Sequence, residues 1–241
     1  HSIQRKELQE FHQKHYQKGL SKIAIVGALT EVQVNKISDL SKPYCISQSL
    51  QFESKFCNQP GHLHLEKEDA VQTAIRIGKT LFNKTHSDFL DMSILSTILG
   101  DYFGSRLMKN IREDKGYTYG IGTAIAETGG SGYFLIGSEV GKEHLSATLA
   151  EIEKELLLLQ NEKVSQDELH LVKNHLFGQI LKMSDGPYAM MDLYLSVESY
   201  GFETDFYNSY IQRIHDINEN DLLKIANSHL HWNEMSIISA G

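Results

Sequence analysis

Long apolar runs, cysteine and an excess of positive charge are all scarce in this chain of 241 residues. Uninterrupted runs of apolar side chains, such as Leu156–Leu159, are only four residues long, whereas a membrane-spanning helix needs about 20. Lys and Arg number 23 against 31 Asp and Glu, a net charge of −8. A nucleic-acid binder needs clustered cations, so this balance disfavours that class of protein and no membrane span is expected.

The two cysteines, Cys45 and Cys57, lie in one polar stretch and form no CxxC pair. Two cysteines cannot build a disulfide scaffold, and a thiolate zinc knuckle is excluded. Whether Cys45 and Cys57 are joined by a disulfide or remain free thiols stays open.

The motifs that hold a catalytic metal or nucleophile are also missing. Neither HExxH nor HxxEH occurs, and there is no GxSxG and no P-loop. His62 and His64 share one face of a predicted strand, but a zinc site needs a third ligand and outer-shell support. The sequence therefore predicts no metal site and no catalytic residue in this chain alone.

Apolar periodicity predicts an α+β fold with a mixed or antiparallel β-sheet covered by helices on one face. We expect helices at 3–16, 31–41, 86–99, 105–115, 143–161, 165–183, twice within 187–214, and at 219–229. Strands are expected at 22–27, 62–67, 70–78, 117–126, 132–140 and 234–240, with 117–126 and 132–140 forming a hairpin.

The two ends of the chain resemble each other when shifted by 214 residues. The shift places Leu8 on Leu222, and both segments are read as a helix, a short loop and an apolar strand. Such an internal repeat suggests two related halves, of which the chain holds the tail of one and all of the next. The predicted strand 22–27 would then pair with the sheet of the preceding half.

The stretch Ser105–Gly120 runs from a helix end into a strand and carries two side chains suited to binding a peptide carbonyl. Arg112 lies in the last helical turn, and Tyr119, on the same predicted strand face as Tyr117, is the third strand residue. An arginine fork and a phenol at one point would offer up to six donors. The alternative is a helix-end arginine favoured by the helix dipole and a half-buried core tyrosine.

This stretch resembles the second half of the pitrilysin and insulin-degrading-enzyme family of zinc metallopeptidases, which includes the mitochondrial processing peptidases. The matching residues are Ser105-Arg106-Leu107, Arg112, Gly116 and Tyr119. Segments 20–28, 72–78 and 164–169 also look like the family, so the resemblance covers essentially the whole chain. It implies two similar α+β halves around a chamber, with zinc on HxxEH in the first half and an Arg/Tyr pair in the second.

On this resemblance, residues 1–41 are the tail of a preceding zinc-bearing half, 42–61 a linker, and 62–241 a C-terminal domain without zinc. Arg112 and Tyr119 would bind the peptide substrate, while zinc would belong to the intact enzyme. The expected partners are a zinc-bearing N-terminal half or partner subunit, a peptide substrate, and a second copy of this chain.

Two other interpretations remain open. The chain can be a partner subunit that assists a separate zinc-bearing peptidase chain, or a non-enzymatic relative like the core proteins of respiratory complexes. The retained Arg112 and Tyr119 favour a peptidase role. The compartment is not fixed, and a soluble protein of the bacterial cytoplasm or periplasm is the expectation.

Overall fold

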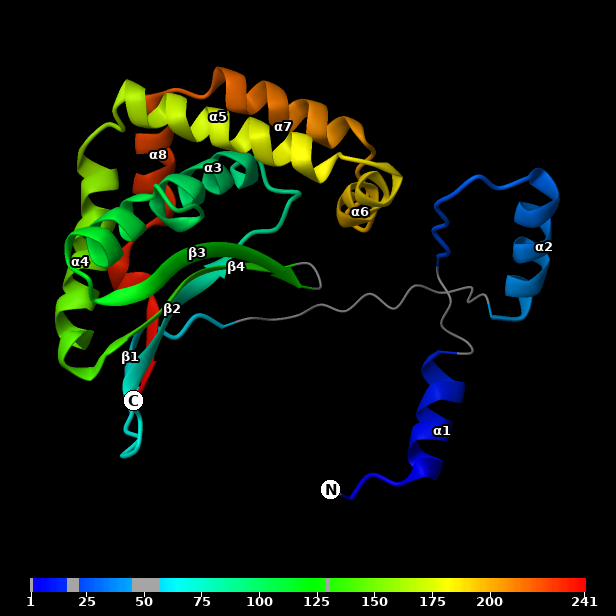
Figure 1. Cartoon of the computed structure of the whole chain (residues 1–241), viewed down its shortest axis with the longest axis horizontal. Helices are drawn as coiled ribbons and strands as arrows, with labels where there is room; N and C mark the ends of the chain where they lie inside the picture. Colours follow the sequence, from blue (N-terminus) through cyan, green and yellow to red (C-terminus); the bar gives the residue numbers. More distant parts are fainter. Residues whose placement is uncertain (1, 17–21, 45–56, 129–130) are drawn as a thin grey trace. The chain divides into compact units, whose positions relative to one another are not determined.

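The computed structural model describes residues 2–16, 22–44, 57–128 and 131–241 (Figure 1). The chain divides into two compact units, one formed by His1–Phe52 with Met183–Ser196, the other by Glu53–Lys182 with Val197–Gly241. Cys45 lies outside the described residues and Cys57 is exposed, so the structure does not test a disulfide between them.

The larger unit is built on a five-stranded mixed sheet in the order β1-β5-β2-β4-β3. The strands are β1 (Gly61–Leu65), β2 (Gln72–Leu81), β3 (Thr118–Thr128), β4 (Ser131–Gly141) and β5 (Ser236–Ala240). Only β1 and β5 run parallel to each other, while β5, β2, β4 and β3 are antiparallel neighbours. The predicted hairpin is confirmed as the β3–β4 pair, which leaves β3 at one edge of the sheet.

The helices of this unit gather on one face of the sheet (Figure 1). They are α3 (Phe89–Gly100), η2 (Met108–Asp114), α4 (Leu145–Asn161), α5 (Gln166–Met183), α7 (Asp205–Asp216) and α8 (Glu219–His229). Short 3₁₀ turns lie at η3 (Lys142–His144) and η4 (Trp232–Glu234). None of the helices in the described part of the chain has the length and hydropathy needed to cross a bilayer.

Burial alternates along the central strands, as expected for a sheet with one covered face. On β4, Phe134, Ile136 and Val140 are fully buried beneath the helices, whereas Tyr133 and Glu139, which point to the other face, are exposed. The predicted α+β class with one covered face is therefore confirmed. The uncovered side is called the open face below.

The smaller unit contains α1 (Arg5–His15), α2 (Glu31–Ser41), the 3₁₀ turn η1 (Lys42–Tyr44) and most of α6 (Pro187–Glu198). Helix α2 covers the predicted helix 31–41, and Thr30 is its N-cap residue, with its hydroxyl accepting from the Gln33 backbone N–H at 3.4 Å. The predicted strand 22–27 is wrong, because residues 22–30 have no strand assignment. A strand requires a neighbouring strand for its backbone hydrogen bonds, and no described strand pairs with this segment.

The 214-residue repeat is clearest in the helices, since α1 shifted by 214 coincides with α8 at both ends. Their packing differs. Leu222 of α8 is fully buried, whereas its counterpart Leu8 of α1 is 60% exposed. The same helix pattern thus has a covered apolar face at one end of the chain and an uncovered one at the other.

Candidate functional site

Tyr119 lies on a β-bulge near the start of the edge strand β3. Thr118 pairs with Val140 and Ile121 pairs with Ser138, so the step from 118 to 121 on β3 spans only two residues of β4. The inserted residue breaks the alternation of side chains. Tyr119 is therefore 88% exposed, while Tyr117 packs against the core. The prediction that the two tyrosines share a strand face is wrong, and so is the alternative of a half-buried core tyrosine.

Two buried hydroxyl groups hold the bulge in place. The Thr118 hydroxyl donates to the Glu139 carbonyl at 2.7 Å and accepts from the Gly120 N–H at 3.1 Å. The Ser138 hydroxyl lies 3.0 Å from both Thr118 Oγ1 and the Gly120 carbonyl oxygen. These bonds satisfy backbone groups that the bulge removes from the strand ladder, and they fix the direction in which Tyr119 leaves the sheet.

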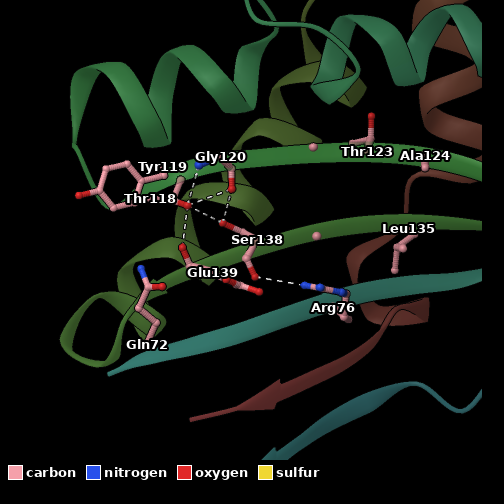
Figure 2. Close-up of a pocket in the computed structure, with 12 residues that line it drawn as sticks. Gln72, Arg76, Thr118, Tyr119, Gly120, Thr123, Ala124, Leu135, Ser138 and Glu139 are labelled. Atoms are coloured by element: carbon pink, nitrogen blue, oxygen red, sulfur yellow. Dashed lines mark hydrogen bonds between the residues drawn. The ribbon is translucent and has the colours of Figure 1, made fainter. Parts of the chain in front are cut away.

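Tyr119 lines a cavity of about 430 Å³ along strands β2, β4 and β3. Small residues form much of its lining, together with a few polar side chains that include Gln72, Arg76 and Glu139. Figure 2 shows Gln72, Glu139 and Tyr119 toward one end of the three strands, with Arg76 further along β2. The lining of the cavity is therefore mostly small side chains. Arg76, Gln72 and Tyr119 add hydrogen-bond donors, and Glu139 adds a carboxylate.

Arg112 lies in η2, a seven-residue π-helix. π-Helical turns are rare and often occur at functional sites. The guanidinium carbon of Arg112 lies 4.8 Å from the centre of the exposed Phe103 ring, a cation–π contact. Arg112 is not among the residues that line the Tyr119 cavity. The convergence of Arg112 and Tyr119 on one substrate group remains a prediction.

Arg106, next to Ser105 in the same motif, has a structural partner. Its guanidinium donates two hydrogen bonds to the Glu168 carboxylate, both at 2.8 Å. Burial lowers the pKa of Arg106, but the Glu168 bond and nearby carboxylates outweigh it and raise the pKa overall. Ser165 caps α5 by accepting from the Glu168 N–H at 3.2 Å, while the Glu168 carboxylate binds Arg106. This pair ties the helical turn that precedes η2 to α5.

The described residues contain no group of three His, Cys, Asp or Glu side chains placed to hold a metal ion. His62 and His64 do share a strand face, as expected. Both rings are within hydrogen-bond distance of the buried Ser239 hydroxyl, His62 Nε2 at 3.0 Å and His64 Nδ1 at 2.8 Å. In this arrangement the two histidines join the edge strand β1 to β5.

The sequence reasoning missed Arg76 and Glu139. Both lie on the open face, at the polar positions of strands whose alternate residues are buried. In the predicted strand 70–78, Thr73, Ile75 and Ile77 form the buried set. The alternation alone places Arg76 on the opposite face, so the signal was present in the sequence.

Comparisons with known proteins identify related chains. The family model described as the peptidase M16 inactive domain matches residues 2–176. A curated relative, the uncharacterized zinc protease YmxG of Bacillus subtilis, is 25% identical over 115 residues, which are 48% of this chain and 28% of the relative.

Two solved structures have the same fold over nearly the whole chain. The peptidase M16 inactive domain from Pseudomonas fluorescens is 24% identical with a TM-score of 0.85, and the match covers 100% of this chain and 58% of that one. A protease from Helicobacter pylori is 16% identical with a TM-score of 0.81, covering 99% and 59%. This chain thus spans less than two thirds of the length of each of these relatives.

Proposed function

Since the chain belongs to the family of the peptidase M16 inactive domain, we propose that it binds the peptide substrate of a zinc metalloendopeptidase. The open sheet face would form one wall of the substrate chamber, and a zinc-bearing half would lie opposite. This half would be joined to the chain or would be a separate partner subunit.

The observation that carries the proposal is the position of Tyr119. A bulge held by Thr118 and Ser138 leaves the Tyr119 side chain exposed on the open face, at one end of the cavity that it helps to line (Figure 2). An 88% exposed tyrosine on a fixed backbone contributes little to the core, and bulges often aim side chains at ligands. Its O–H is a donor for a peptide carbonyl.

Zinc in the intact enzyme would supply hydrolytic chemistry. The described residues of this chain do not form a ligand set for it, so we assign the metal to the zinc-bearing half. The part of this chain is to hold and orient the peptide. Tyr119 and Arg112 would donate hydrogen bonds to the substrate backbone.

The isolated chain tests this division of labour. After purification and incubation with zinc, we expect less than about one tenth of an equivalent of bound metal by mass spectrometry, because stable zinc sites need three or four protein ligands. We also expect no cleavage of a fluorogenic peptide library. Zinc-dependent cleavage by the isolated chain, abolished by a chelator, would contradict the proposal.

A further inference from the structure

The open face carries one cation at its centre, Arg76 of β2. Strand register places Arg76 opposite Gly137 of β4 and Ile238 of β5. The same row continues to Gly122 at one edge of the sheet and to Leu63 at the other. Residues opposite one another share a face. The row across the open face therefore consists of two glycines, then Arg76, and then two exposed apolar side chains, those of Ile238 and Leu63.

The guanidinium of Arg76 lies over Gly137. A Cβ atom at position 137 would be 3.6 Å from Arg76 Nη1, an ordinary van der Waals distance, so the guanidinium packs closely over this residue. Nη1 donates to the carbonyls of Ile75 and Ser138 at 2.8 and 3.3 Å. These two bonds fix the fork in position on the sheet, and Figure 2 shows the one to Ser138.

The other half of the fork remains available. No hydrogen bond or ion pair from Arg76 Nε or Nη2 is found within the described parts of the chain. The nearest carboxylate in register is Glu139, which lies opposite Ala74, two residues along the strand from Arg76. A fixed guanidinium with free donors, facing a cavity, is suited to a carboxylate.

We propose that Arg76 makes this chain selective for peptides with an internal Asp or Glu side chain. The inference rests on the proposed peptide-binding function and names its substrate class. The sheet extends on both sides of Arg76, to Gly122 and to Leu63, so a bound chain can continue past it in both directions. Glu139 repels a second carboxylate nearby, which limits the preference to one acidic position.

The test uses the full 241-residue chain and three labelled decapeptides of alanine and leucine. The first has a central glutamate and the second a central glutamine, and both have acetylated and amidated ends. The third has glutamine and a free terminal carboxylate. By fluorescence anisotropy we expect the glutamate peptide to bind about tenfold more tightly than the glutamine peptide, as charge-assisted bonds exceed neutral ones.

Two variants of Arg76 and one control identify the residue responsible. Arg76→Gln should abolish the difference between the first two peptides, and Arg76→Lys should keep part of it because the charge remains without the fork. Lys224→Gln, at an exposed position of α8, changes the net charge equally and should retain the full preference. Thermal melting checks that each variant is folded.

Three outcomes would overturn the inference. These are equal binding of the first two peptides to the wild-type chain, an unchanged preference in Arg76→Gln, and a preference for the free terminal carboxylate alone. In all three the chain still binds peptides, so the proposed function stands. If none of the peptides binds at millimolar concentration, the proposed peptide-binding function fails, and the inference fails with it.

Discussion

In an enzyme assembled from this chain and a zinc-bearing half, Tyr119→Phe is expected to lower peptide turnover by about 100- to 1,000-fold. The substitution removes one hydroxyl donor, and losing an oxyanion donor typically costs about 2.7–4 kcal/mol of transition-state stabilisation. Folding should be almost unaffected, because the ring is 88% exposed and surface changes usually shift stability by under about 0.5 kcal/mol. Steady-state cleavage of a fluorogenic peptide and thermal melting measure the two effects separately.

Tyr133→Phe is the matched control for this experiment. Tyr133 of β4 lies opposite Ala126 on the open face, but it does not line the cavity. We expect its loss of a hydroxyl to leave turnover within about twofold of the wild-type rate. Equal turnover of Tyr119→Phe and the wild-type enzyme would exclude Tyr119 from the chemistry.

Gly100→Ala is expected to lower the free energy of unfolding by about 1–3 kcal/mol, the usual cost of overpacking a core. Gly100 ends α3, and a Cβ atom there would lie 2.5 Å from Thr123 Cγ2 and 2.8 Å from the Thr123 backbone nitrogen. Relief of the clash would separate α3 from β3 and weaken the buried Ser96–Thr123 hydroxyl bond at 3.0 Å. Denaturant unfolding followed by circular dichroism measures the loss.

Gly178→Ala should instead raise the free energy of unfolding. Gly178 lies inside α5, and a Cβ atom there meets nothing within 4 Å. Alanine in a helix interior is favoured over glycine by about 0.8–1.0 kcal/mol, so this variant should gain roughly that amount. Equal effects of the two substitutions would show that α3 does not approach β3 closely enough to exclude a side chain.

The sequence predicted most elements because their signals are local. Asn218 begins α8 through its own side chain, which accepts from the Asn220 N–H at 2.9 Å. Gly116 follows η2 with a positive φ of 67°, as expected for a helix C-terminus. Apolar periodicity located the hairpin and the long helix α4 for the same reason, because the spacing of apolar residues within one element shows which of its faces is buried.

The missed features depend on residues distant in the chain. The bulge at Tyr119 follows from bonds between Thr118 and Ser138, and alternation along β3 alone predicts the wrong face. The π-helical geometry at Met108–Asp114 is not encoded in an apolar period. The segment 22–27 has a strand-like composition, but strand formation needs a neighbour that composition does not specify.

Reconstitution with a zinc-bearing chain that carries HxxEH, taken from the same source, tests the central claim most directly. The two chains are assayed for peptide cleavage separately and mixed, with zinc present or chelated. We predict zinc-dependent cleavage only in the mixture, with the activity saturating as the two chains form a complex. Full activity of the zinc-bearing chain by itself, unchanged on addition of this chain, would contradict a substrate-binding role.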